Sequence, residues 1–147
     1  MRFALHARDI PGRVATGAFI LHSGIDKWNG SAEVAEGVHA MASGAFPFLG
    51  SIPAERFLKV LAAGEIATGA LLLAPIVPSF VAGAALSGFA GSLLAMYGRT
   101  PALHKEGSPW PSQAGIAVSK DVWMLGIGLA LMLSGANANE SNAEPTP

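Results

Sequence analysis

Apolar residues fill one stretch of the chain, from Ile66 to Gly98, which contains no charged side chain. A single α-helix of that length would be about 50 Å long, well beyond the hydrocarbon core of a bilayer at about 30 Å. Pro75 and Pro78 lie near the middle of the stretch. Because a proline lacks a backbone N–H and disfavours helix in the residue before it, these two prolines favour a break. The pattern therefore predicts two membrane-spanning helices joined by a tight turn.

Two further apolar segments extend this pattern to four predicted spans. The segment Val14–Ile25 is apolar enough for the core of a signal peptide, but Asp26, Lys27 and Trp28 follow it instead of a small-residue cleavage site. We therefore predict that it is retained as the first span. The four predicted spans cover residues 11–28, 54–74, 78–98 and 118–135.

A shorter segment, residues 31–43, lies between the first and second spans. Ser31 is typical of a helix N-cap, while Glu33 and Glu36 make a segment of this length too acidic to cross a membrane. The predicted fold is therefore all-α, a four-transmembrane-helix bundle with a short interfacial helix between spans 1 and 2. This membrane domain takes up residues 1–138, and a disordered polar tail follows at residues 139–147.

Small residues recur at every fourth position in the third and fourth predicted spans. Such stripes let helix backbones approach closely in a membrane. The predicted contact positions are Gly83, Ser87, Gly91 and Ala95 in the third span, and Gly126, Ala130 and Ser134 in the fourth.

The composition excludes several kinds of chemistry but identifies no reaction. Only 13% of the residues are charged and the formal net charge is -1, which argues against a nucleic-acid binder. The chain contains no cysteine, so disulfide exchange, thiolate metal sites and iron–sulfur clusters are excluded within it. No complete catalytic motif is present, and whether the protein is an enzyme stays open at this level.

Glu65 is the strongest candidate for a catalytic group, because it lies about 15 Å inside the second predicted span. An ionisable side chain at that depth needs a partner or a water-filled cavity. His22 and Asp26 are four residues apart and share a face of the first span. His22 is predicted to lie close to the depth of Glu65, so that a contact between the two side chains is sterically plausible. One histidine and one glutamate are too few ligands to indicate a metal site.

Further charged residues collect at the ends of the predicted spans that bear the two longer loops. One interpretation is that they extend to the lipid headgroups. The other is a polar funnel that opens on the loop side, with His22 and Glu65 at its floor, Lys27 and Lys120 along its wall, and Trp123 against a flat ligand. The charged residues concerned are Asp26, Lys27, Arg56, Lys59, Arg99, Lys120 and Asp121.

Two short motifs resemble those of DoxX-like membrane proteins. They are LHSGIDK, from Leu21 to Lys27, and AGEIATG, from Ala63 to Gly69. The resemblance implies a four-helix bundle in a bacterial cell membrane that takes part in quinone-linked oxidation as a subunit of an oxidoreductase system. Only Lys27 and Glu65 match recurring positions of that family. The sequence itself indicates no cofactor, and a quinone is the cofactor class that the resemblance implies.

Three functions are compatible with these observations. The first is a DoxX-like subunit that binds a quinone or another small ligand in the loop-side funnel. The second is a structural or assembly subunit of a membrane complex without chemistry of its own, and the third is a small transporter. Each predicts a multi-pass protein in contact with the lipid bilayer, together with partner subunits or further copies of the chain.

Overall fold

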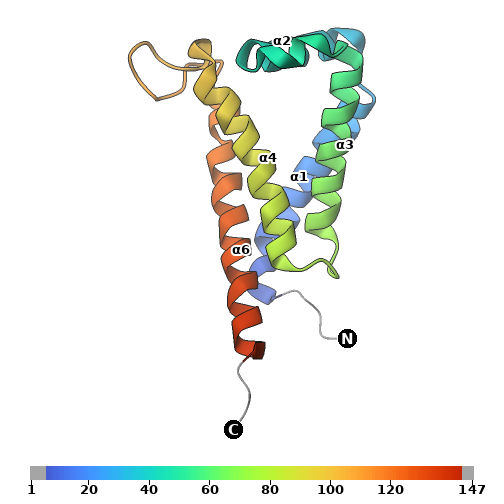
Figure 1. Cartoon of the computed structure of the whole chain (residues 1–147), viewed down its shortest axis with the longest axis vertical. Helices are drawn as coiled ribbons and strands as arrows, with labels where there is room; N and C mark the ends of the chain where they lie inside the picture. The colour runs from blue at the N-terminus through green and yellow to red at the C-terminus, as the bar shows by residue number, and fades with distance from the viewer. Residues whose placement is uncertain (1–5, 144–147) are drawn as a thin grey trace.

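The computed structural model describes residues 6–143, with side chains as far as Ala136, and within this part the chain is all-helical and has no β-strand. Four long helices dominate (Figure 1): α1 (Ile10–Trp28), α3 (Ala54–Leu73), α4 (Ser79–Arg99) and α6 (Asp121–Ala143). The shorter helices are η1 (Ala7–Asp9), α2 (Ala32–Ala45), η2 (Pro47–Ser51), η3 (Pro101–Leu103) and α5 (Ile116–Ser119).

The long helices follow the predicted segments closely. The expected break is present, since α3 ends at Leu73 and α4 begins at Ser79 after the proline-containing turn. Two segments, Ser79–Arg99 and Ile116–Ala136, are long and apolar enough to cross a membrane. At the C-terminus α6 continues to Ala143, so the predicted polar tail begins inside this helix, and its last residues, 144–147, lie outside the described part.

The four long helices associate chiefly as two antiparallel pairs. Helix α1 packs along α3, and α4 packs along α6, whereas α3 and α4 contact each other less extensively. Figure 1 shows that α3 and α4 lie close together at their connecting turn and diverge toward the opposite end. A core cluster near the converging end takes side chains from all four helices, namely Ile20, Leu72, Ala82, Leu86 and Leu131.

Glycines set the close approach within each pair. A Cβ added at Gly83 of α4 would lie 2.5 Å from the carbonyl oxygen of Gly128 in α6, and one added at Gly69 of α3 would lie 2.7 Å from the backbone nitrogen of Leu21 in α1. The small-residue stripe predicted on the third span therefore contacts α6 at Gly83. Gly91 and Gly126 belong to the same predicted stripes but face open space.

Helix α2 lies across the end of the molecule where α3 and α4 diverge (Figure 1). The side chain of Ser31 accepts a hydrogen bond from the backbone N–H of Val34, as expected of an N-cap. Ala42 and Ala45 of α2 are buried in a second apolar cluster with Met96 of α4. The sequence therefore predicted this helix correctly, and its buried face joins the two diverging helices.

Candidate functional site

Glu65, the residue singled out by the sequence, is buried and forms an ion pair with the partly buried Lys27. The two residues come from α3 and α1, and the distance from Lys27 Nζ to Glu65 Oε2 is 3.1 Å. Lys27 Nζ also donates to Ser23 Oγ at 2.6 Å. Glu65 is only 4% exposed. Gly24 makes the pairing feasible, because a Cβ at that position would lie 2.9 Å from the Glu65 Cβ and would force the helices apart.

A pair of this kind is sensitive to loss of either member. Removing one partner of a buried ion pair leaves an uncompensated charge and typically destabilises a protein by about 3–5 kcal/mol. Lys27 and Glu65 are also the two residues that match recurring positions of the DoxX-like motifs. The sequence therefore identified both members, although it did not predict that they contact each other.

Asp121 adds a second carboxylate to the same region. It is the first residue of α6, it is buried, and it lies close enough to Glu65 for the two carboxylates to interact electrostatically. Besides the Lys27–Glu65 pair, the interior therefore contains a second carboxyl group, from α6. Sequence reasoning counted Asp121 among the charged residues at the ends of the spans but did not select it as a site residue.

His22 does not join this cluster, and its expected contact with Glu65 is wrong. His22 pairs instead with Asp26 at 3.3 Å, and their side chains are 77% and 66% exposed. Five residues separate His22 from Lys27, which corresponds to about 140° around a helix. The face of α1 that carries Lys27 packs on α3, so His22 and Asp26 lie on the outer side.

The polar funnel expected on the loop side is not assembled either. Lys120 is exposed, and Trp123 is 68% exposed on the outer surface of α6. Lys59 is exposed as well, donates to the carbonyl oxygen of Trp28 and lies over its ring, 4.9 Å from the centroid. Of the charged residues expected at the funnel, only Lys27 and Asp121 accompany Glu65 toward the interior.

An apolar cavity of about 500 Å³ is present at the same end of the long helices, but none of the residues expected at the funnel lines it. It lies between α2 and the diverging parts of α3 and α4. Leu61, which lines it, is one helical turn from Glu65 on α3. The remaining lining side chains are mostly apolar and include Val34, Val38, Met41, Phe57, Leu93 and Met96. No sequence signal indicated this cavity, because it results from the divergence of two helices.

A second buried polar cluster lies at the other end of the long helices. Arg13 is 1% exposed, and its guanidinium donates to the carbonyl oxygens of Leu72 (2.8 Å), Leu71 (3.0 Å), Ala74 (2.8 Å) and Val77 (2.9 Å). The last carbonyls of a helix lack intrahelical donors, so Arg13 caps the C-terminus of α3 and the turn that follows. In the sequence this residue was read only as part of the basic N-terminal flank.

Asp9 completes this second cluster. Its carboxylate accepts hydrogen bonds from Ser79 Oγ at 2.5 Å and from Ser134 Oγ at 3.2 Å, which links the start of α1 to α4 and α6. Arg8 Nε donates to the same Ser134 hydroxyl at 3.1 Å. The arrangement holds the converging ends of the helices together.

Comparison of the chain with family models, known proteins and solved structures gives no significant match. The DoxX-like resemblance therefore stays a prediction from short motifs of the sequence and their order. Within the described part of the chain no group of three histidine, aspartate or glutamate side chains is placed to hold a metal ion. The side chains of Lys27 and Glu65 can form hydrogen bonds, pair their charges and exchange protons.

Proposed function

We propose that the protein is a multi-pass integral protein of a bacterial cell membrane that binds a quinone, or another small apolar ligand with a polar head, beside the Lys27–Glu65 pair. In this proposal it serves as a DoxX-like subunit of a quinone-linked oxidoreductase system. The observation that supports it best is that Glu65, buried and paired with Lys27, lies one helical turn from Leu61, which lines an apolar cavity.

The exterior of the helices supports the membrane part of the proposal. Large apolar side chains are strongly exposed on α1 (Phe19, 69%), α3 (Val60, 66%) and α6 (Leu133, 67%), and Phe80 of α4 is half-exposed. A monomeric protein in water rarely exposes so much apolar surface. Helices of 19 to 23 residues are also about as long as a hydrocarbon core is thick.

The charges deepest in α1 and α3 are compatible with membrane crossing because the protein itself satisfies them. Arg13 is covered by backbone carbonyls, and Lys27 and Glu65 neutralise each other. Ionisable groups inside membrane helices characteristically face the protein interior and pair with one another or with backbone carbonyls. We therefore expect all four long helices to cross the bilayer, with α2 at the interface.

The cavity and the pair together suit a flat ligand with carbonyl groups. The ring and tail would occupy the apolar cavity beneath α2, and the ammonium of Lys27 would donate to a ligand carbonyl. An ammonium has three N–H donors, and two of those of Lys27 are directed to Ser23 and Glu65. Reduction of a quinone takes up protons as well as electrons. In this proposal each proton would first be taken up by the carboxylate of Glu65 or Asp121 and then passed to the quinone, and a partner subunit would supply the electrons.

Binding of decylubiquinone to the detergent-purified protein, measured by isothermal titration calorimetry, tests this proposal. We expect Leu61→Trp to weaken binding by filling the cavity. We expect Lys27→Met to weaken it about tenfold or more, since a hydrogen bond from a charged donor contributes about 1.5–3 kcal/mol. Asp26→Asn, next to Lys27 but on the outer face of α1, is the matched control. Equal affinities in all four proteins, or no binding by the unaltered protein, would reject the proposal.

A structural or assembly subunit is the alternative that a specific observation favours. Among the described side chains no buried nitrogen or oxygen lacks a hydrogen-bond partner, so the polar clusters are complete without a ligand. This alternative predicts that Glu65→Gln lowers the stability of the protein and the yield of its complex, while oxidoreductase activity per assembled complex stays constant.

A further inference from the structure

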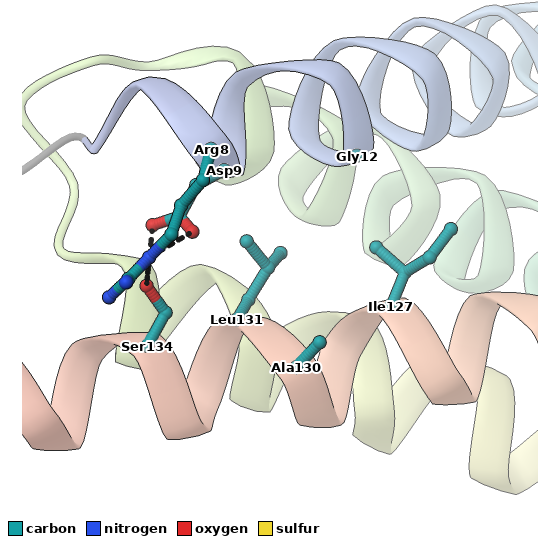
Figure 2. Close-up of a pocket in the computed structure, with 7 residues that line it drawn as sticks. All are labelled: Arg8, Asp9, Gly12, Ile127, Ala130, Leu131 and Ser134. Carbon is teal, nitrogen blue, oxygen red and sulfur yellow. Dashed lines mark hydrogen bonds and ion pairs between the residues drawn. The ribbon is translucent and has the colours of Figure 1, made fainter.

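A groove with one polar end lies between the middle of α6 and the segment formed by η1 and the start of α1 (Figure 2). Its volume is about 410 Å³. The apolar part is formed by Gly12 of α1 together with Ile127, Ala130 and Leu131 of α6. Gly12 keeps this part open, because even a single added Cβ would lie 3.1 Å from the Ile127 side chain. The groove is remote from the cavity beneath α2, which lies at the opposite end of the long helices.

The polar end is formed by Arg8, Asp9 and Ser134. Figure 2 shows Arg8 extending from the start of α1 toward Ser134 on α6, with its guanidinium beyond the apolar side chains. The side chain of Arg8 is 63% exposed, whereas Asp9 is buried and accepts hydrogen bonds from Ser79 and Ser134.

The charge balance at this end is positive. Arg13 lies close enough to Asp9 for their opposite charges to attract, and Arg8 Nε is 3.9 Å from Asp9 Oδ1. Two arginines therefore share one carboxylate, and Arg8 is the exposed member of the pair. An exposed guanidinium at the end of an apolar groove suits an anionic group that carries an alkyl chain.

We propose that this groove binds an anionic phospholipid, with its phosphate at Arg8 and one acyl chain along Gly12, Ile127 and Ala130. The inference rests on the membrane embedding proposed above. The direction of the groove fits that embedding, because Ile127 comes two helical turns, or about 10 Å, before Ser134 in α6 and so lies further from the C-terminal end of that helix. The headgroup thus lies at the helix ends and the chain extends toward the middle of the bilayer.

The test is native mass spectrometry of the detergent-purified protein with equimolar phosphatidylglycerol and phosphatidylcholine. We expect the unaltered protein to retain phosphatidylglycerol preferentially. Arg8→Gln should lower this preference about fivefold, the factor that corresponds to about 1 kcal/mol for one basic residue near a lipid surface, and Arg8→Lys should restore most of it. Ala130→Phe should reduce binding of both lipids by filling the groove.

Two matched variants control for the loss of an arginine and for the added bulk. Arg56→Gln removes an exposed arginine at the other end of the helices, and Ala70→Phe adds a ring to an exposed position of α3. Both should bind phosphatidylglycerol like the unaltered protein. Equal retention of the two lipids by the unaltered protein overturns the inference. It is likewise overturned if Arg8→Gln and Ala130→Phe bind like their controls, or if the groove is covered by a second copy in a dimer without lipid.

Extraction of cell membranes with alkaline carbonate separates this inference from the proposed function. If the protein stays in the membrane but shows no preference for phosphatidylglycerol, only the lipid site is rejected. If carbonate releases the protein, the membrane embedding fails and both proposals fall together.

Discussion

Replacing Arg13 by methionine removes the guanidinium that joins α1 to the end of α3 and to the turn before α4. The carbonyl oxygens of Leu71, Leu72, Ala74 and Val77 lose a donor each. Leu71 and Leu72 lie in the last turn of α3, where carbonyls lack intrahelical donors. The substitution therefore leaves polar backbone atoms without a partner in an apolar environment.

The expected loss of stability follows from two opposing terms. A hydrogen bond from a charged donor contributes about 1.5–3 kcal/mol, so four such bonds set an upper bound of about 6–12 kcal/mol. Methionine also removes the desolvation penalty of a buried charge, which amounts to several kcal/mol. The net fall in the free energy of unfolding should therefore be about 3–5 kcal/mol, the range found when a buried charged network loses a member.

Reversible unfolding in mixed micelles, with an increasing fraction of sodium dodecyl sulfate and far-UV circular dichroism as the readout, measures this difference. Arg56→Met is the matched control, since Arg56 is exposed and should change the stability by no more than about 0.5 kcal/mol. The loss of stability for Arg13→Lys should lie between those for Arg13→Met and Arg56→Met, because an ammonium cannot reproduce the planar fork of donors. A loss for Arg13→Met as small as that for Arg56→Met would refute the reasoning.

Three further predictions concern the helix contacts and the ion pair. Gly83→Ala should lower the free energy of unfolding by about 1–3 kcal/mol, because the added Cβ meets the α6 backbone. Gly88→Ala, which faces open space, should raise it by up to about 1 kcal/mol. The same micelle titration measures both variants, and equal effects would contradict the described packing of α4 on α6. A double-mutant cycle of Lys27→Met and Glu65→Gln should give a coupling energy of about 1–3 kcal/mol, and a value near zero would show that the pair does not interact. His22→Ala should leave stability and decylubiquinone affinity unchanged, and a tenfold loss of affinity would place His22 in the site.

The sequence was most informative where local chemistry decides the structure. The uncharged stretch from Ile66 to Gly98 predicted two antiparallel helices joined by a tight turn, because the prolines in its middle disfavour a continuous helix. Ser31 predicted the start of α2 for a similarly local reason. Glu65 stood out because an apolar segment offers a carboxylate no solvent, so a partner was expected within the protein.

The partner of Glu65 could not be selected from depth alone. Lys27 is about 7.5 Å further along α1 than His22, which was expected at the depth of Glu65, but the rotation of α1 against α3, set at Gly24 and Gly69, turns Lys27 inward. Arg13 was missed for another reason. Its four acceptors are backbone carbonyls, which carry no signal in the sequence, and they become available only where α3 ends.

The cavity beneath α2 also escaped prediction from the sequence. Its walls are ordinary apolar residues such as Leu61 and Met96, which read as core positions in a helical pattern. The space exists because α3 and α4 contact each other at one end and diverge at the other, while α2 covers the opening (Figure 1). A cavity of this kind depends on the angle between helices, which local propensity does not determine.

Photoaffinity labelling in native membranes tests the central proposal most directly. An azido-quinone, activated by light and mapped by peptide mass spectrometry, should label the segments that line the cavity, around Val38, Leu61 and Met96. Excess decylubiquinone should suppress this labelling, and Leu61→Trp should abolish it. Labelling confined to the outer surface of α6 around Trp123, or labelling that excess quinone does not reduce, would contradict quinone binding beside the Lys27–Glu65 pair.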